Sequence, residues 1–462
     1  MRTPLLAALL LAAAPAAAAI PADPWHAQAR AVLEHMVSVR SSDGHRNVPA
    51  LADWLAQRFI AAGVPASAIV HLPLGETEAM VVRIAGRDRA KKPILMSAHL
   101  DVVDANPKDW TRDPFRLVEE NGYFFGRGVA DDKTSATQLA ITIERMAREH
   151  KVPSRDLIFA FVGDEETSEA TTAMLAGPKK ALIDAEYEIE FDGNDGLLGP
   201  DGKPVIYFIA ASEKTYSDYT LTVTNPGGHS SLPRADNAIY ELADALGKVR
   251  AYQFPPEANA ITRSELATGG KVTPGALGAA MRAFAANPSD ATAAATLSAD
   301  PTYVGMVRTT CVATMLGGGH AMNALPQSAT ANINCRIFPG TSPEQVRVRL
   351  ASIVGPGVRV TKGPDGGEES PVSPPRADVE AAVAHAVHAY APGVPIAYSQ
   401  PAGASDAAYF RRAGIPSYGT SGMFLRSEDD FMHGLNERLS VKAFYDSIDY
   451  AWTLVGDLAD PK

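Results

Sequence analysis

Imidazole and carboxylate side chains stand directly behind short apolar runs of this sequence. The residues concerned are His99, Asp101, Asp131, Glu165, Glu166 and Asp192. Short apolar runs are typical of buried strands, and in an open α/β sheet the loops at the carboxyl ends of the strands converge on one crevice. We therefore expect these side chains to meet at one edge of a sheet.

A bound cation explains why so many carboxylates would lie together, since unneutralised they would repel one another. Imidazole and carboxylate ligands without thiolate favour zinc, with manganese or cobalt as substitutes. The set is large enough for two zinc ions about 3.5 Å apart, provided that a second imidazole joins it. His433, in a polar segment that contains glycine, is the candidate.

Glu165 and Glu166 are adjacent, so their side chains point in different directions at a strand end. Glu166 can then bind metal while Glu165 faces the substrate as a general base, taking a proton from water and passing it to a leaving amine. Asp101 comes two residues after His99. We expect it to accept the N–H of the other ring nitrogen and to fix the tautomer of His99.

The elements that must hold these residues follow from apolar periodicity. A strand at 93–98, a helix at 134–150 and a strand at 157–162 form a βαβ unit whose strands are buried on both faces. An amphipathic helix at 48–62 precedes them, and residues 123–125 read as one strand of a hairpin. The sequence therefore predicts an α/β domain with a mixed, largely parallel sheet.

A different pattern, βαββαβ, begins at about residue 216. Its elements are a strand at 219–223, a helix at 238–249, strands at 309–315 and 329–337, a helix at 342–353 and a strand at 358–361. This order is that of a ferredoxin-like unit, here with a helix-prone, Ala-rich insertion around 255–305. We predict a catalytic domain at 20–215 and 365–462, interrupted by a second domain at 216–364.

The first residues have the features of a secretory signal peptide, covering 1–19. Their apolar run is short for a membrane span and Pro15 interrupts it, so we predict a secreted or periplasmic protein without a stable membrane span. The net charge of -11 argues against a nucleic-acid partner. Cys311 and Cys335 are the two cysteines. They pair in a disulfide or are two small buried hydrophobic residues, and the sequence does not decide.

Taken together, the motifs resemble the co-catalytic di-zinc amidohydrolases, which include glutamate carboxypeptidase, carboxypeptidase S, aminoacylase, carnosinase and succinyl-diaminopimelate desuccinylase. The matching segments are SAHLDVV (97–103), GRGVADDK (126–133), GDEET (163–167), EFDGNDG (190–196), NPGGHSSLP (225–233), NALP (323–326), NCRIFPG (334–340) and HGLNER (433–438). They span nearly the whole chain in family order. The resemblance implies a zinc-binding catalytic domain interrupted by a lid domain that commonly dimerises.

The resemblance also implies a metal role for each matched residue. Asp131 is the bridging ligand, His99 and Asp192 bind one zinc ion, and Glu166 and His433 bind the other. Glu165 matches the base of the family and Asp101 its histidine-orienting carboxylate. The segment around Asp192 departs from the family pattern, so that Glu190 or Asp195 could compete as the ligand.

In the lid, the resemblance extends to residues that reach the substrate. His229 matches a histidine that enters the active site of a partner subunit in a homodimer and stabilises the developing oxyanion. Asn323 and Arg336 match substrate-holding positions. Gly403 lies in a segment, 401–406, that resembles a substrate-pocket loop.

We therefore predict an exported zinc-dependent exopeptidase or amidohydrolase that acts on small peptides or N-acyl amino acids. Dipeptidase, carboxypeptidase and aminoacylase activities remain open. A catalytically silent binding protein of the same fold is the alternative, although it would have no need for Glu165. A serine hydrolase would need a G-x-S-x-G motif, which the closest stretches, 228–232 and 419–423, do not match.

Overall fold

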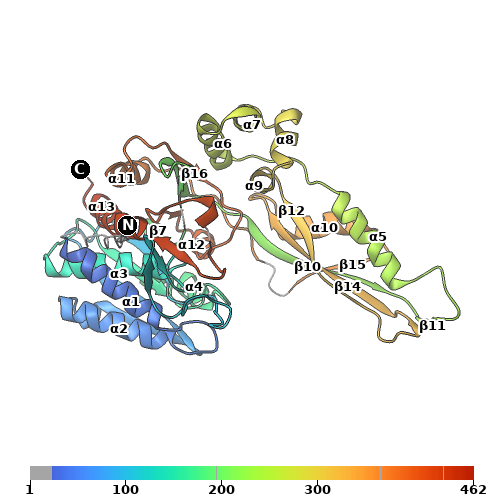
Figure 1. Ribbon diagram of the computed structural model, residues 1–462, viewed down its shortest axis with the longest axis horizontal. Helices are drawn as coiled ribbons and strands as arrows, with labels where there is room; N and C mark the ends of the chain where they lie inside the picture. Colours follow the sequence, from blue (N-terminus) through green and yellow to red (C-terminus); the bar gives the residue numbers. More distant parts are fainter. Residues whose placement is uncertain (1–22, 194, 364–366, 430, 462) are drawn as a thin grey trace, which may run out of the picture.

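The computed structural model of the protein has two lobes (Figure 1). It describes residues 23–193, 195–363, 367–429 and 431–461. The predicted signal peptide lies outside these ranges. Within them, no helix combines the length and the apolar character that crossing a membrane requires.

A ten-stranded sheet forms the centre of the larger lobe, in the order β1-β2-β6-β3-β7-β17-β9-β8-β18, with β16 paired to β9. Its strands are β1 (Ile69–Leu74), β2 (Thr77–Ile84), β3 (Ile94–His99), β6 (Leu157–Val162), β7 (Tyr187–Glu190), β8 (Gly196–Leu198), β9 (Pro204–Ala210), β16 (Ile396–Ser399), β17 (Ser417–Gly419) and β18 (Phe424–Leu425). The four neighbours β6, β3, β7 and β17 run parallel, while β1, β2 and β8 make antiparallel pairs. The predicted α/β class with a mixed sheet is confirmed.

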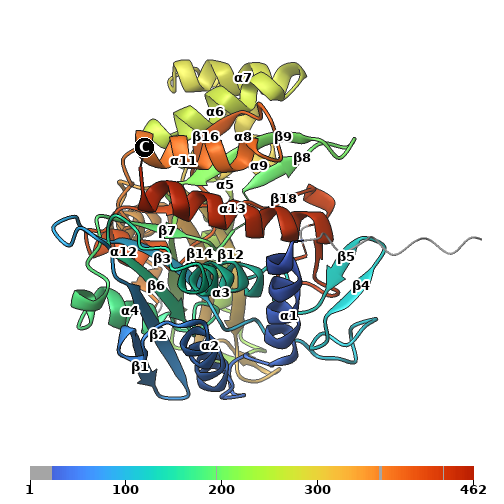
Figure 2. The ribbon, with the colours of Figure 1, turned by 90° about the vertical axis from the view of Figure 1, so that its left-hand side faces the viewer.

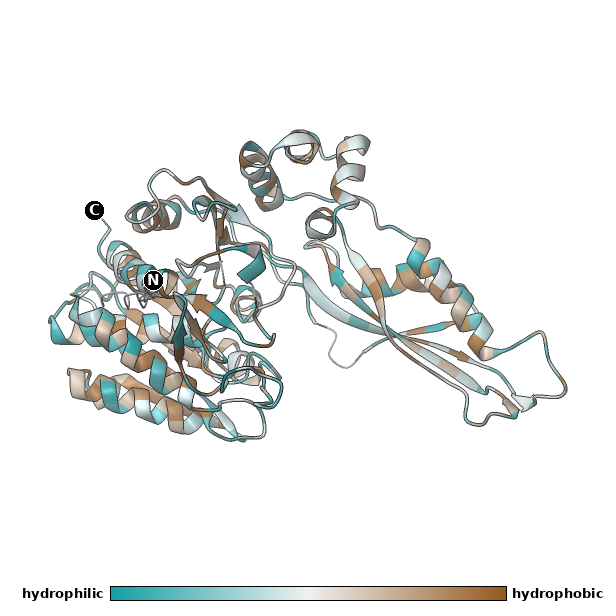
Figure 3. Ribbon diagram, in the orientation of Figure 1, coloured by the Kyte–Doolittle hydropathy of each residue, from teal (hydrophilic) through white to brown (hydrophobic). Residues whose placement is uncertain are grey.

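Helices cover both faces of this sheet. One face is covered by α1 (Pro24–Ser38), α2 (Val48–Ala62), α3 (Lys133–Arg148), α11 (Ala377–His388) and α13 (Val441–Ala459), and the other by α4 (Ala170–Ala176) and α12 (Ala407–Arg412). Figure 2 shows α1, α3 and α13 in front of the sheet, and Figure 3 shows hydrophilic and hydrophobic residues alternating along the helices.

The burial of β6 on both faces explains why its sequence is an unbroken apolar run. Phe159 and Phe161 belong to the core under α3, whereas Ile158 and Ala160 belong to the core on the opposite face. Successive side chains of a strand point to opposite faces, so a strand covered on both faces must be apolar throughout. The predicted βαβ unit of β3, α3 and β6 is therefore present, with β3 and β6 paired in parallel.

A small antiparallel sheet lies beside the large one. It consists of β4 (Val118–Glu120), β5 (Tyr123–Phe125) and β19 (Arg438–Ser440), in the order β19-β5-β4. The hairpin expected at 123–125 is confirmed. Its third strand, β19, comes from the far end of the chain and carries the preceding segment, with His433, to the loop that follows β5.

The smaller lobe is built on a four-stranded antiparallel sheet in the order β12-β14-β10-β15. Its elements are β10 (Thr215–Thr224), α5 (Ala238–Ala251), β12 (Thr310–Gly318), β14 (Ser328–Ile337), α10 (Pro343–Val354) and β15 (Arg359–Lys362). These follow the predicted βαββαβ order, and α5 and α10 share one core with the sheet. At the end of the lobe far from the large sheet, β11 (Gly228–His229) pairs with β13 (Ala324–Leu325) (Figure 1).

The predicted helical insertion consists of α6 (Ala260–Val272), α7 (Gly275–Ala286), α8 (Ala291–Ser298) and α9 (Pro301–Val304). Three short 3₁₀ turns complete the described elements, at Ala66–Ala68, Lys180–Leu182 and Ser427–Asp429. The insertion helices share a core of their own. In addition, α6 packs against β16 and β9 of the large sheet, so the insertion contacts the larger lobe.

Cys311 and Cys335 form a disulfide. They lie opposite each other on the neighbouring strands β12 and β14. The alternative that the sequence left open is thus resolved, and the bond ties the edge strand β12 to its inner neighbour β14.

Candidate active site

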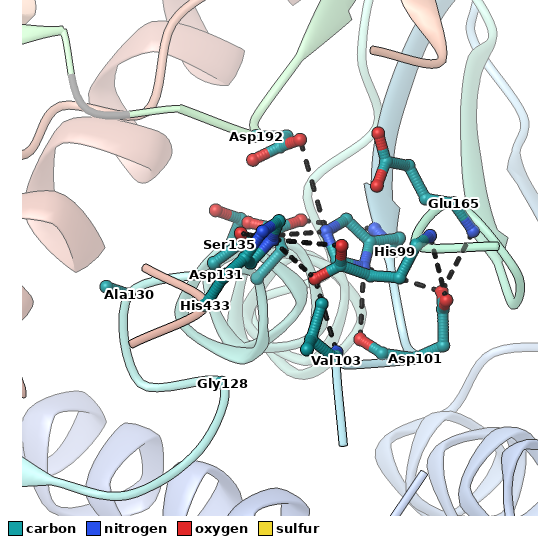
Figure 4. Close-up of polar contacts among 12 residues, drawn as sticks. His99, Asp101, Val103, Gly128, Ala130, Asp131, Ser135, Glu165, Asp192 and His433 are labelled. Atoms are coloured by element: carbon teal, nitrogen blue, oxygen red, sulfur yellow. Dashed lines mark hydrogen bonds and ion pairs between the residues drawn. The ribbon is translucent and has the colours of Figure 1, made fainter. Parts of the chain in front are cut away.

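Asp131 lies between two imidazoles at the carboxyl edge of the large sheet (Figure 4). Its Oδ1 atom is 3.0 Å from Nε2 of His99, the last residue of β3. Its Oδ2 atom is 3.0 Å from Nε2 of His433, which is 302 positions further along the chain and is brought in by β19. One carboxylate oxygen therefore faces each imidazole, which is the placement that a bridging ligand requires.

Glu166 and Asp192 complete the two sides of this arrangement. Glu166 Oε2 is 3.0 Å from Nε2 of His433, and Asp192 Oδ2 is 4.0 Å from Nε2 of His99. Two ligands of one tetrahedral zinc ion are about 3.3 Å apart, given bonds of about 2.0 Å. The structure therefore brings all the predicted metal ligands together, and their donor set fits two divalent cations.

Asp132 is a further carboxylate at this site that the sequence analysis did not assign. It is fully buried, and its Oδ2 accepts the backbone N–H of His99 at 3.1 Å. Ligand atoms of His99, Asp132 and Asp192 lie within 4.8 Å of one another, as do those of Asp131, Glu166 and His433. In the sequence, its position directly after Asp131 was the feature that could have indicated a place at this site.

Glu190 and Asp195, the two competitors of Asp192, are engaged elsewhere. Glu190 accepts the backbone N–H of Ala407 at 2.9 Å and the hydroxyl of Ser405 at 2.9 Å. Asp195 accepts hydrogen bonds from the hydroxyls of Ser421 and Tyr207, at 3.0 and 3.2 Å. Asp192 is thus the carboxylate of this segment that faces His99.

The site carries more negative charge than its two imidazoles neutralise. Burial, together with the charge of Asp131, raises the pKa of Asp192 to about 7. Hydrogen bonds to Asp131 and Glu166 raise the pKa of His433 to about 10. Burial opposes the ionisation of Asp131, but hydrogen bonds from His433 and His99 outweigh it and lower the pKa of Asp131. These carboxylates need positive charge nearby, which a bound cation supplies.

Asp101 links the loops that follow β3 and β6. Its carboxylate accepts the backbone N–H groups of Glu165 and Glu166, at 3.1 and 3.0 Å. The nearest acceptor to Nδ1 of His99 is the backbone carbonyl of Asp101 at 3.0 Å, with the carboxylate oxygen at 3.4 Å. The expected orienting role is therefore shared between the two groups, because the chain turns directly after His99 and places that carbonyl against the ring.

Glu165 lies beside the cluster formed by the predicted metal ligands His99, Asp131, Glu166, Asp192 and His433. It is not part of the contacts around Asp131. A carboxylate oxygen of Glu165 lies within 4.8 Å of ligand atoms of His99 and Glu166. In Figure 4 its side chain extends away from Asp101, toward the side on which Asp192 lies. Burial raises the pKa of Glu165 well above its usual value. This is the position that a proton-accepting group next to the cations would take.

Glu437 holds the loop that carries Asp131, a role that the sequence analysis missed. Its fully buried carboxylate accepts the backbone N–H groups of Gly128, Ala130 and Asp131, at 3.0, 2.8 and 3.2 Å. It also pairs with Arg127 at 2.7 Å. The motif HGLNER contains this residue, but backbone hydrogen bonds leave no signal in the spacing of side chains.

A cleft of about 1150 Å³ opens beside the cluster, between the two lobes. Glu165, Glu166 and His433 line it on one side, and Arg336 on the other. The Arg336 guanidinium lies over the ring of Tyr216, 4.8 Å from its centroid. Arg336 therefore faces the space next to the cluster, where the prediction places a substrate.

The other predicted lid residues lie away from this cleft. His229 and Asn323 are exposed on β11 and beside β13, at the far end of the smaller lobe (Figure 1). The backbone N–H of Ser230 donates to the carbonyl of Asn323 at 3.1 Å, so the two predicted residues are neighbours. Gly403 is exposed in the loop at 401–406, where Ala404 and Ser405 line the cleft.

Comparison with known proteins places this arrangement in a family. A model of peptidase family M20/M25/M40 matches residues 95–456. The protein named probable carboxypeptidase S-like 2 of Dictyostelium discoideum is 28% identical over 399 residues, which cover 81% of this chain and 73% of the relative. The N-fatty-acyl-amino acid synthase/hydrolase PM20D1 of Xenopus tropicalis is 27% identical over 422 residues, covering 88% and 80%.

Solved structures share the fold at lower sequence identity. The M20 family metallo-carboxypeptidase Sso-CP2 from Sulfolobus solfataricus superposes with a TM-score of 0.69 and 17% identity, covering 93% of this chain and 98% of that one. The Bacillus subtilis protein YXEP, described as a dinuclear metal binding peptidase from the M20 family, gives a TM-score of 0.60 and 11% identity, covering 94% and 98%. Both similarities extend over both lobes.

Proposed function

The chain belongs to peptidase family M20, and on this premise we propose that it is an exported, two-zinc exopeptidase or amidohydrolase that hydrolyses small peptides or N-acyl amino acids. Membership of the family makes it a hydrolase of the metallopeptidase and amidohydrolase type. The observation that carries the proposal is the position of Asp131 between His99 and His433, with Glu165 beside them.

Each residue of the cluster has a defined task in this reaction. His99, Asp131 and Asp192 would hold one cation, and Asp131, Glu166 and His433 the other. When bound, two divalent cations supply Lewis-acid polarisation and lower the pKa of a water molecule. Glu165 takes the proton of the attacking water and passes it to the leaving amine. Asp101 and Glu437 hold the loops that carry Glu165, Glu166 and Asp131 in place.

Arg336 supports the substrate class. Its planar guanidinium binds a carboxylate through two parallel hydrogen bonds, as the free carboxylate of an exopeptidase substrate or an N-acyl amino acid requires. The names of the relatives, a carboxypeptidase and an N-fatty-acyl-amino acid synthase/hydrolase, agree with such substrates. We assign Asn323 and Gly403 to substrate contacts that form only when the smaller lobe, or that of a partner subunit, approaches the cleft.

A homodimer through the smaller lobe would complete the site. The edge strand β12 exposes Val312, Met315 and Leu316, with 58%, 71% and 72% of each residue accessible. An exposed apolar edge strand favours pairing with another chain. His229 Nδ1 accepts the backbone N–H of Ser231 at 3.2 Å, which leaves the proton on Nε2 for donation to a developing oxyanion.

Export rests on the apolar N-terminal run. The disulfide between Cys311 and Cys335 supports it, because such bonds persist mainly in oxidising compartments. The predicted cleavage near Ala19 would leave a chain that begins just before α1.

The test of this proposal is hydrolysis of a panel of dipeptides, longer peptides and N-acyl amino acids by the mature protein. We expect turnover that a chelator abolishes and added zinc restores, with two zinc ions bound per chain. Arg336→Lys keeps the positive charge but loses the two parallel donors of the guanidinium, so KM for carboxylate-bearing substrates should rise about tenfold. Two bound zinc ions without hydrolysis of any panel member would instead support the binding-protein alternative.

A further inference from the structure

The insertion helix α6 is part of the packing of the larger lobe, although the sequence places it between two strands of the smaller one. Ile261, in its first turn, is fully buried in the core shared with α3 and α13, whereas Leu266, further along, belongs to the core of the insertion itself. The helix packs against β16 and β9 (Figures 1 and 2). The insertion is thus docked on the sheet that carries the metal cluster.

Gln400 is the point at which α6 meets that sheet. It directly follows β16 and is 1% exposed. Its side-chain carbonyl accepts Nδ2 of Asn259 at 2.7 Å and the hydroxyl of Ser212 at 3.1 Å. Its backbone N–H donates to the carboxylate of Glu265 at 2.9 Å. Two side chains of the insertion therefore fix both the backbone and the side chain of one buried residue.

The loop at 401–406 begins at this fixed residue and ends at the cleft. The hydroxyl of Ser405 lies 2.9 Å from Glu190 and 3.0 Å from Glu213. Glu190 ends β7, two positions before Asp192, and Glu213 lies in the connection from β9 to β10 that leads into the smaller lobe. Within the loop, the carbonyl of Ala402 lies 3.5 Å from a guanidinium nitrogen of Arg336. The loop is thus set between the cluster and the substrate-facing arginine.

We propose that the helical insertion positions the cleft loop at 401–406, with Asn259 and Glu265 acting through Gln400. Both are positioning residues, since they touch neither the cluster nor the cleft loop beyond Gln400. The proposal rests on the proposed hydrolase function, because the loop is taken as one wall of its substrate cleft. Loss of the Glu265 contact leaves the buried N–H of Gln400 without its acceptor, and loss of the Asn259 contact leaves the Gln400 carbonyl with Ser212 alone, so either change loosens the start of the loop.

The test compares substitutions that break these contacts with one that keeps them. Glu265→Leu removes the acceptor of the Gln400 N–H. Asn259→Ser keeps the cap of α6, since Ser also caps helices, but no longer reaches Gln400. Both should raise KM for the preferred substrate about tenfold and change kcat less than about twofold, at unchanged zinc content. Glu265→Gln retains an acceptor and should behave as wild type.

Leu297→Ala is the matched control. Leu297 is fully buried in the core of the insertion, so the change lowers the stability of the insertion while leaving the contacts of Gln400 in place. Equal KM increases in Leu297→Ala and Glu265→Leu, or a Glu265→Gln enzyme as impaired as Glu265→Leu, would overturn the proposal. So would wild-type KM values in both Glu265→Leu and Asn259→Ser.

Hydrogen exchange separates this proposal from the function on which it rests. In the zinc-loaded protein, the backbone N–H of Ala407, which donates to Glu190 at 2.9 Å at the end of the loop, should exchange faster in Glu265→Leu than in Glu265→Gln or Leu297→Ala. Wild-type protein that hydrolyses no substrate would contradict the proposed function, and the exchange pattern would still decide the role of α6. Identical exchange in all three variants would contradict the positioning role.

Discussion

His99 and His229 lie in opposite surroundings, although the sequence marks both as functional. The side chain of His99 is 1% exposed and touches Asp131 and Asp101 within one chain. His229 is exposed at the far end of the smaller lobe, beside β13. The cluster of candidate metal ligands is thus assembled by the fold of a single chain, whereas His229 would act only if another chain or a lobe movement brought it to the cleft. The proposed function thus divides preorganisation and closure between the two lobes.

Substitution of His229 should have the largest effect. His229→Ala should lower kcat by about 10²- to 10³-fold if its Nε2–H stabilises the oxyanion of a partner subunit. Mixing this variant in equal amounts with Glu165→Gln, after dissociation and reassociation, should restore about a quarter of wild-type activity, because each mixed dimer contains one intact site. Activity that stays at the level of the separate variants would show that His229 does not act across subunits.

Substitution of Glu437 tests whether the candidate metal ligands are held in place before a cation binds. Glu437→Gln removes the charge that holds Arg127 and weakens the hold on the loop of Asp131. We expect zinc affinity to fall about 10- to 100-fold, as measured by competition with a chelator. Glu428→Gln, an exposed residue of the same segment, is the control. Unchanged zinc affinity in Glu437→Gln would mean that the cluster does not depend on this anchor.

The disulfide belongs to the smaller lobe alone. Cys311→Ser with Cys335→Ser opens a bridge between positions 24 residues apart. The expected loss is about 3 kcal/mol of stability in that lobe, seen as a fall of about 5–10 °C in its thermal transition. Zinc content should not change, since the cluster lies in the other lobe. A loss of zinc in this variant would show that the two regions are not independent.

Glu265, at the junction of the lobes, should give the smallest effect. Burial raises its pKa to about 8, opposed only by the hydrogen bond from the backbone N–H of Gln400. Because the folded pKa is raised, the stabilisation is fully present below the unfolded pKa of about 4.3 and is lost as the pH rises through 8. Between pH 5 and 9, wild type should therefore lose about 2–4 °C more in thermal midpoint than Glu265→Gln. Parallel pH profiles would contradict this assignment.

Much of the fold and of the cluster could be predicted because their signals are local. The unbroken run of β6 identifies a strand covered on both faces, and Glu165 and Glu166 lie three and four residues after its end. The polar, glycine-containing segment made His433 a candidate, and the resemblance to the di-zinc family assigned it a ligand role. No local pattern shows that β19 pairs with β5 and so brings His433 to the site. The ferredoxin-like order of the smaller lobe was equally readable from alternating strands and helices.

The residues that were missed act through backbone groups or through distant packing. Glu437 binds three backbone N–H groups, and such partners carry no side-chain pattern. Gln400 is an ordinary polar residue after a strand, and its burial depends on where α6 docks. That docking depends on Ile261, one apolar residue among many in the helix. Long-range packing of this kind is a property of the assembled fold.

The proposed hydrolysis of an amide bond requires the candidate metal ligands and Glu165 to act together. The most direct measurement is kcat of Glu165→Gln on the best panel substrate, at zinc content measured to equal that of wild type, with Glu149→Gln at the end of α3 as control. We expect a fall of about 10²- to 10⁴-fold in kcat for Glu165→Gln and wild-type turnover for the control. Wild-type turnover by zinc-loaded Glu165→Gln would contradict it.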